Sequence, residues 1–182
     1  MRWAAHRHAQ WYLAGLSFAE SSFFPIPPDV MLAPMALADT KKALRFAAIA
    51  TLFSVIGGAA GYAIGMFAFD IVQPWLQAAG YMDKYQIAVE WFNKWGIWVI
   101  FIAGFSPIPY KVFTIAGGVI AMSFLPFILA SFIGRGMRFF MVAGLMMWGG
   151  DRMDQVFRKY VDRIGWATVV AVALLIVWIE FS

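Results

Sequence analysis

Cysteine is absent from this chain of 182 residues, and charged side chains are scarce. Without thiols the chain can form neither a disulfide bond nor a thiolate metal site, so its redox compartment cannot be inferred. The two histidines, His6 and His8, are too few for a zinc site. GxSxG, HExxH and P-loop motifs are also missing, and we therefore expect no enzyme activity, no metal and no cofactor.

Apolar residues dominate the composition of the chain. They make up 63% of the chain, charged residues only 13%, and the mean hydropathy is +0.74. Soluble domains typically contain about 25% charged residues. This composition predicts an all-α integral membrane protein of one domain. The net charge of +4 comes largely from basic residues in short loops beside apolar runs, where they set topology and do not indicate a nucleic-acid partner.

One short phrase occurs twice, as Pro25–Val30 (PIPPDV) and Pro107–Val112 (PIPYKV), with four identical positions of six. Proline breaks helices, and hydrocarbon tolerates free backbone groups only where protein or water satisfies them. Two broken segments in corresponding halves are typical of a transport site near the bilayer midplane. The prolines expected at the two tips are Pro25, Pro27, Pro28, Pro107 and Pro109.

The expected architecture is an inverted repeat of two re-entrant, proline-broken hairpins, each followed by a transmembrane helix. Interfacial amphipathic helices and a C-terminal transmembrane helix complete it. The spanning helices are expected at 44–69 and 126–149, and Pro74 and Pro126 are expected to begin helices. The proposed division of the single domain 1–182 is repeat 1 at about 9–69, an amphipathic linker at 70–94, repeat 2 at about 95–149, and a second linker with the C-terminal helix at 150–182.

Charge distribution favours hairpins over complete crossings. With two re-entrant hairpins, nine basic residues lie on one side and only Lys84 and Lys94 on the other. Complete crossings would give eight against three, so the positive-inside rule favours hairpins modestly and places the N-terminus in the cytoplasm. The nine residues are Arg2, Arg7, Lys41, Lys42, Arg45, Arg152, Arg158, Lys159 and Arg163.

Arg135 and Arg138 lie near the centre of an apolar run. One charge at a helix centre costs at least ~2.5–3.5 kcal/mol, so we expect both to face a wet cavity or carboxylates. Glu20 and Asp29, which flank the first break, are the expected partners, and Lys111 follows the second break. These five residues could hold a phosphate, for which arginine offers a bidentate fork, while Glu20 could carry a proton. Alternatively, they pair only to stabilise the fold.

Small residues mark the helices that follow the breaks. Gly57, Gly61 and Gly65 recur at four-residue spacing, and Gly117 and Gly118 follow the second break. Small residues let helices approach closely in lipid, so we expect these glycines to serve helix packing.

Four motifs occur in order within residues 15–145 and cover most of the chain. Together they resemble the DedA superfamily (the VTT or SNARE-associated-like proteins), most closely its small YqaA-like branch. They are Glu20-x4-Pro25-x-Pro27-Pro28-Asp29, Gly57-Gly58-x2-Gly61-Tyr62-x2-Gly65, Phe105-Ser106-Pro107-Ile108-Pro109-Tyr110-Lys111 with Ala116-Gly117-Gly118, and Gly134-Arg135-Gly136-Met137-Arg138-Phe139.

The resemblance implies a multi-pass protein of the bacterial inner membrane, with facing re-entrant hairpins. It implies lipid translocation, in some members of undecaprenyl phosphate, with a proposed dependence on proton motive force. It makes Glu20 and Asp29 the family's acidic pair and Arg135 and Arg138 its functional arginines. One departure concerns Lys111, which stands where the main branch has arginine.

The function predicted first is therefore a flippase or scramblase for a phosphate-bearing lipid, coupled to protons. Two alternatives remain, a proton-coupled transporter of a small solute or drug and a non-transporting membrane-homeostasis factor. The expected partners are membrane lipids and protons, with no nucleic acid, and a homo-oligomer is left open.

Overall fold

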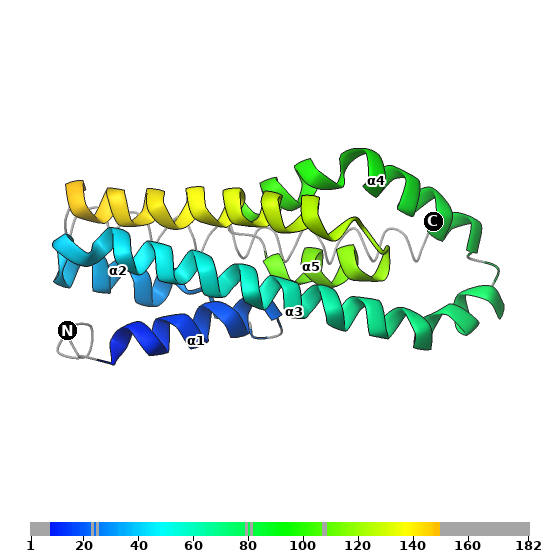
Figure 1. Ribbon diagram of the computed structural model, residues 1–182, viewed down its shortest axis with the longest axis horizontal. Helices are drawn as coiled ribbons and strands as arrows, with labels where there is room; N and C mark the ends of the chain where they lie inside the picture. Colours follow the sequence, from blue (N-terminus) through cyan, green and yellow to red (C-terminus); the bar gives the residue numbers. More distant parts are fainter. Residues whose placement is uncertain are drawn as a thin grey trace, which may run out of the picture.

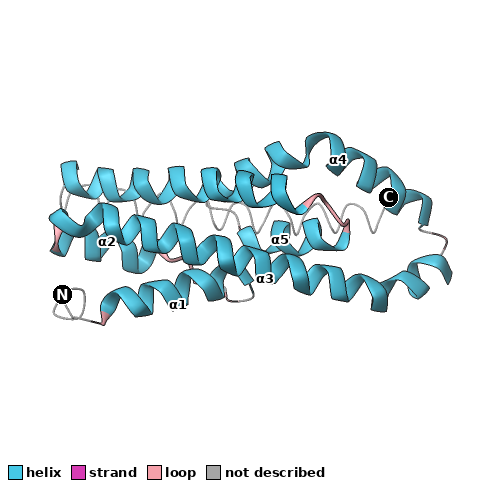
Figure 2. Cartoon of the chain, viewed as in Figure 1, coloured by secondary structure: helices cyan, strands magenta, loops and turns pink. Residues whose placement is uncertain are grey.

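The structure is a computed structural model that describes residues 8–22, 24, 26–78, 80, 82–106 and 109–149. Across these ranges every regular element is a helix and no strand occurs (Figure 2). The tip prolines Pro25 and Pro107, the linker expected at 150–164 and the C-terminal helix expected at 165–181 lie outside the described residues.

Two long helices run along the molecule, and shorter helices pack beside them (Figure 1). The long ones are α3 and the helix Phe124–Gly149, which we call the last described helix and which Figure 1 draws in yellow to orange. The labelled elements are α1 (Ala9–Ser22), α2 (Asp29–Ala38), the 3-10 helix η1 (Thr40–Lys42), α3 (Ala43–Ala78), α4 (Met82–Phe105) and α5 (Tyr110–Val119).

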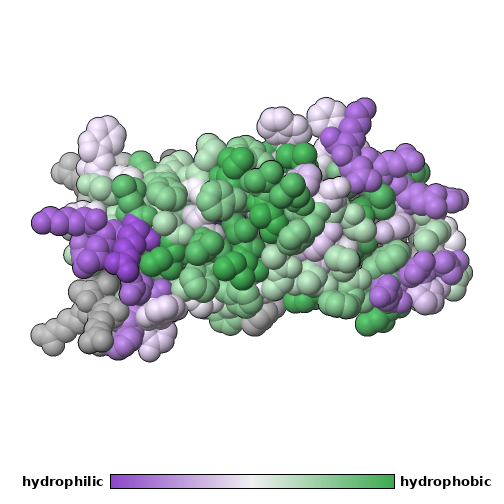
Figure 3. All heavy atoms as spheres, viewed as in Figure 1, coloured by the Kyte–Doolittle hydropathy of each residue, from purple (hydrophilic) through white to green (hydrophobic). Residues whose placement is uncertain are grey.

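Both long helices can cross a bilayer. The stretch Thr40–Ile71 has 32 residues and contains an 18-residue window of mean hydropathy 1.7, and the last described helix has 26 residues and contains such a window of mean hydropathy 1.4. At ~1.5 Å per residue each exceeds the ~30 Å thickness of the hydrocarbon core. In the view of Figure 3, hydrophobic residues cover the middle of the molecule and hydrophilic residues gather toward its two ends. The segments expected at 44–69 and 126–149 are thus confirmed as helices long and apolar enough to span a membrane.

Each proline-containing break separates two helices. Before the first break, the Phe24 amide donates to the Ala19 carbonyl. After it, the Val30 and Met31 amides donate to the carbonyls of Pro27 and Pro28 and begin α2. Proline has no amide hydrogen, so these positions cannot continue the ladder of α1. Pro109 precedes α5 in the same way. Because α1 has 14 residues and α2 has 10, neither is long enough to cross alone.

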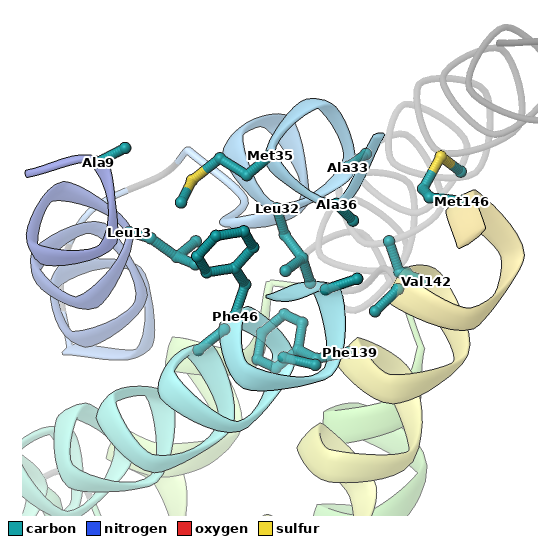
Figure 4. Close-up of a cluster of buried hydrophobic side chains, with 14 residues drawn as sticks. Ala9, Leu13, Leu32, Ala33, Met35, Ala36, Phe46, Phe139, Val142 and Met146 are labelled. Atoms are coloured by element: carbon teal, nitrogen blue, oxygen red, sulfur yellow. The ribbon is translucent and has the colours of Figure 1, made fainter. Parts of the chain in front are cut away.

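At the first break the chain folds back. The start of α1, the end of α2, the start of α3 and the end of the last described helix all contribute to one apolar cluster. Figure 4 shows Leu13, Leu32, Phe46 and Phe139 pointing into it. Since both ends of the α1–α2 segment reach this cluster, the chain returns to the end of the molecule from which it entered.

A second cluster joins the other elements. It combines Tyr62 of α3, Ile100 of α4, Tyr110 of α5 and Phe127 of the last described helix. The Tyr85 hydroxyl of α4 donates to the Val119 carbonyl at the end of α5, over 2.9 Å. The chain therefore also turns back at the second break, and α4 and α5 contact each other.

The region 70–94 differs from the expected amphipathic linker. Helix α3 continues to Ala78, Gly80 adopts a positive φ of 70°, and α4 then runs without interruption to Phe105. The apolar run that was expected to begin repeat 2 at 95 is the second half of α4. Pro126 lies in the first turn of its helix as expected, but Pro74 lies inside α3, so its assignment as a helix start was wrong.

Candidate functional site

The two arginines of the last described helix are buried and paired. Arg135 is 2% exposed and Arg138 is 5% exposed. Arg135 Nη2 lies 2.5 Å from Glu20 Oε2, and Arg138 Nη2 lies 2.6 Å from Asp29 Oδ2. The expectation that Glu20 and Asp29 supply the counter-charges is confirmed. Each pair joins the last described helix to one arm of the first hairpin segment, Glu20 on α1 and Asp29 on α2.

Several neutral partners hold Arg135. Its Nε donates to the Ser54 hydroxyl of α3 over 2.6 Å. The rings of Tyr110 and Phe139 lie 5.0 and 4.7 Å from the guanidinium carbon, a distance at which aromatic faces attract cations. On the carboxylate side, the Ser21 hydroxyl donates to Glu20 Oε2 over 3.0 Å. Arg135 is thereby held by α1, α3 and α5 together.

Arg138 connects the two breaks. Its Nε and Nη2 both donate to Asp29 Oδ2, at 3.2 and 2.6 Å, and its Nη1 donates to the Phe105 carbonyl at 3.3 Å. Asp29 is the first residue of α2, and Phe105 is the last residue of α4. Asp29 Oδ1 is buried and has no hydrogen-bond partner in the part of the chain that the structure describes. A buried acceptor without a partner calls for an explanation, since such groups are rare.

The two hairpin segments also touch directly. The Thr114 hydroxyl of α5 shares its single hydrogen between the Lys111 carbonyl of its own helix, at 2.9 Å, and the Ser21 carbonyl near the end of α1, at 3.2 Å. Gly61 of α3 lies against this contact, because a Cβ at Gly61 would approach the Ser21 carbonyl oxygen to 3.1 Å and would meet the Thr114 side chain more closely still. Helix α3 therefore passes the point where α1 meets α5.

The other small residues allow close helix crossings. A Cβ on Gly57 would overlap the Phe18 carbonyl of α1, and one on Gly65 would overlap the Ile115 carbonyl of α5. Gly118 lies in the same way against the Tyr62 carbonyl. A Cβ at Gly117 would meet the rings of Phe127 and Tyr62 at 3.7 and 3.8 Å, which are ordinary contacts.

The remaining candidate residues lie at the breaks. Pro27, Pro28 and Pro109 are in the breaks themselves, and Lys111 is half-buried on the first turn of α5. Four of the five charged residues predicted for the site form the two buried ion pairs, Glu20 with Arg135 and Asp29 with Arg138. Lys111 is beside Tyr110, whose ring contacts Arg135, and its carbonyl accepts a hydrogen bond from Thr114 at 2.9 Å.

Sequence reasoning missed the hydroxyl groups of the site. Ser21, Ser54 and Thr114 are fully buried, as is Tyr110, whose hydroxyl donates to Ser131. One signal was available for Ser54, which is polar inside a long apolar run.

An exposed ion pair provides a contrast. Lys42 Nζ lies 2.6 Å from Asp39 Oδ2, the same distance as in the Arg138–Asp29 pair, but both side chains are solvent-accessible. The hydrogen bond from Lys42 lowers the pKa of the Asp39 carboxyl below its usual value.

An apolar groove lies between α4 and the last described helix. Its volume is about 420 Å³, within the range of ~300–1,000 Å³ that small-molecule sites occupy. Phe101 contributes to its wall, and the Phe101 carbonyl packs on Gly134, the residue before Arg135. The residues that line the groove are Ile97, Trp98, Phe101, Pro126, Leu129, Ala130 and Ile133.

Two helix–break–helix segments, two helices of bilayer-spanning length and two buried ion pairs between apolar clusters are the features of a helical membrane protein. Residues 26–147 match the model of the VTT domain, and the chain therefore belongs to the VTT-domain, or DedA, family. The matched region includes Asp29, Arg135 and Arg138.

Two relatives match nearly the whole chain. An uncharacterised protein of Haemophilus influenzae is 49% identical over 170 residues, which cover 93% of this chain and 88% of that protein. Its homologue from Histophilus somni is also 49% identical, over 93% of this chain and 89% of its own length. Undecaprenyl phosphate transporter A of Staphylococcus aureus is 30% identical over 95 residues, 52% of this chain and 45% of that protein. No solved structure matches the chain.

Proposed function

We propose that this protein moves a phosphate-bearing lipid across the bacterial inner membrane, as a flippase or scramblase, without a chemical step. The observation that carries the proposal is the buried layer in which Arg135 and Arg138 pair with Glu20 and Asp29. Charges at this depth of a membrane protein are expensive and usually functional. The similarity to a protein named as an undecaprenyl phosphate transporter supports a polyprenyl phosphate as one candidate substrate.

The proposed membrane arrangement is an inverted repeat of two re-entrant hairpins, α1–α2 and α4–α5. The folding back of each segment into its own apolar cluster supports it, as does the contact between Ser21 and Thr114. Hairpins that enter from opposite faces and meet inside the bilayer shorten the polar path that a lipid head group must cross. The N-terminus would then be cytoplasmic, on the same side as Lys41 and Arg45.

A lipid phosphate would bind by competing with the carboxylates for arginine. Guanidinium groups bind phosphate bidentately, as they bind carboxylates. Arg138 is the better entry point, because Arg135 is also held by the Ser54 hydroxyl and by two aromatic rings. As the phosphate takes Arg138, the link between Asp29 and the Phe105 carbonyl opens, and the two hairpins can separate.

A proton would assist the exchange at Asp29 or Glu20. A proton on Asp29 Oδ1, which has no hydrogen-bond partner among the described residues, would neutralise the carboxyl group and release Arg138 for the phosphate. Its departure would restore the ion pair and expel the head group. The family resemblance to proteins with a proposed dependence on proton motive force is consistent with this step.

The apolar groove supports a lipid rather than a hydrophilic solute. It offers no charged side chain, and a hydrocarbon tail could lie along it while the head group reaches Arg138 on the same helix. This placement would keep the tail outside the charged layer.

The test is lipid movement in vesicles. Purified protein in liposomes is given a labelled polyprenyl phosphate or a labelled phospholipid, and we expect faster transbilayer movement than in protein-free vesicles. If folded protein moves neither lipid, with or without an imposed pH gradient, the proposal fails and a proton-coupled solute transporter becomes the better explanation.

The membrane arrangement has its own test. Because the chain has no cysteine, single cysteines can be introduced at the exposed residues His8 and Lys41 without altering a natural thiol. With a re-entrant first hairpin, a membrane-impermeant reagent should label these two positions from the same side of the inner membrane. Labelling from opposite sides would indicate a complete crossing between them and would contradict the arrangement.

A further inference from the structure

Ser54 closes a ring of hydrogen bonds around the Glu20–Arg135 pair. Its hydroxyl lies 2.6 Å from Arg135 Nε and 2.6 Å from the Ser21 hydroxyl. Ser21 in turn lies 3.0 Å from Glu20 Oε2, the same oxygen that Arg135 Nη2 contacts. Four side chains from α1, α3 and the last described helix thus form one closed circuit.

The direction of each bond follows from counting hydrogens. A carboxylate can only accept, so Ser21 donates its single hydroxyl hydrogen to Glu20. The hydrogen between the two serines must therefore come from Ser54, which accepts in turn from Arg135 Nε. Each serine hydroxyl hydrogen is used once, so the bonds run in one direction from Arg135 Nε through Ser54 and Ser21 to Glu20. Aligned hydrogen bonds of this kind strengthen one another in a low-dielectric interior.

Ser54 differs here from its neighbours. A buried hydroxyl in a helix commonly bonds the carbonyl one turn earlier. Ser17 does so with Leu13 at 2.7 Å, and Thr51 does so with Ala47 at 2.8 Å. Ser54 instead directs its hydroxyl across the helix interface to Ser21. Its side chain is fully buried, so in the wild type the Ser54 hydroxyl shields the Arg135 Nε hydrogen from bulk water.

We propose that Ser54 is a positioning residue, which sets the direction of the Arg135 guanidinium so that Nη2 meets Glu20. The rings of Tyr110 and Phe139 contact the guanidinium, and the Ser54 hydroxyl fixes its rotation. The effect of Ser54 on transport rests on the proposed function, whereas its effect on Arg135 does not.

The first arm of the test observes Arg135 itself. In protein labelled with 15N-arginine, the Nε–H signal of Arg135 is assigned by its loss in Arg135→Lys. We expect slow exchange of this hydrogen with water in the wild type. Ser54→Ala should shift the signal and speed its exchange by about tenfold or more, because the acceptor is lost, while the Arg138 signal stays in place. Ser54→Thr keeps a hydroxyl and should preserve slow exchange.

Ser17→Ala is the matched control, because Ser17 is equally buried and its hydroxyl donates to the Leu13 carbonyl of its own helix. It should leave the Arg135 signal unchanged. Fast exchange in the wild type, or an Arg135 signal that Ser54→Ala does not move, would overturn the proposal without any measurement of transport.

The second arm compares lipid movement in vesicles. Ser54→Ala should slow it about tenfold, and Ser17→Ala should leave it at the wild-type rate. An Arg135 signal that shifts while transport stays normal would overturn the claim that the positioning serves transport. If the wild type moves no lipid, the proposed function fails, and the first arm alone decides the role of Ser54.

Discussion

Burial, rather than distance, should decide how much each ion pair contributes to stability. The pairs Arg138–Asp29 and Lys42–Asp39 have the same separation of 2.6 Å. The side chains of the first pair are 6% and 3% exposed, those of the second 58% and 33%. Asp29→Asn and Asp39→Asn are therefore the same substitution in two environments, and we expect very different results.

Asp29→Asn leaves Arg138 as a buried charge without a counter-charge. Removing one partner of a buried pair costs about 3–5 kcal/mol. For a chain of this length each kcal/mol lowers the melting temperature by about 2–4 °C, so the expected fall is about 6–20 °C. The assay is thermal unfolding in detergent, followed by the intrinsic fluorescence of the nine tryptophans. Asp39→Asn should not change the melting temperature beyond experimental error.

The double variant Asp29→Asn/Arg138→Gln distinguishes an unpaired charge from a lost contact. Exchanging a buried ion pair for neutral groups is often close to neutral, so the double variant should recover most of the stability. The reasoning is refuted if Asp29→Asn and Asp39→Asn have the same melting temperature, or if the double variant melts no higher than Asp29→Asn alone.

Three further predictions use other parts of the structure. Gly65→Ala would place a Cβ on the Ile115 carbonyl and should lower the free energy of unfolding by about 1–3 kcal/mol in the same melting assay. Gly144→Ala, where a Cβ has nothing within 4 Å, should raise it by up to ~1 kcal/mol. Equal effects of the two variants would contradict the close crossing of α3 and α5. Tyr110→Phe keeps the ring beside Arg135 but loses the hydrogen bond to Ser131, so the free energy of unfolding should fall by about 0.5–1.5 kcal/mol. Lipid movement should persist in this variant. Loss of movement in folded protein would show that the hydroxyl acts in transport. Lipid movement should depend on pH in the wild type and much less in Glu20→Gln; an unchanged pH profile would remove Glu20 from the coupling step.

The sequence predicted those features of the fold and the site that the chemistry of single residues determines. Proline cannot continue a helix, and charges in hydrocarbon need partners, so the two breaks and the pairing of both arginines with Glu20 and Asp29 could be predicted. The long helices followed from uninterrupted apolar runs. What remained open was which carboxylate meets which arginine, because that depends on how α1 and α2 cross the last described helix.

The ring of hydrogen bonds that Ser54 closes around the Glu20–Arg135 pair could not be predicted from sequence patterns. Whether Ser54 bonds its own helix, as Thr51 does, or reaches Ser21 depends on the angle at which α1 crosses α3, and close contacts such as that of Gly57 with the Phe18 carbonyl set this angle. The boundary expected between residues 94 and 95 was wrong for another reason. The change from amphipathic to apolar sequence occurs inside α4, which runs from Met82 to Phe105, so a change in composition did not mark the end of a helix.

The measurement that tests the central claim most directly is the movement of a labelled polyprenyl phosphate in vesicles that contain either wild-type protein, Arg138→Gln or Lys41→Gln. Lys41 is an exposed basic residue outside the buried layer, so its variant controls for loss of one positive charge. If the buried arginine carries the phosphate, the wild type and Lys41→Gln move the lipid at similar rates, and folded Arg138→Gln does not. Equal movement by all three proteins would contradict a translocation path through the charged layer.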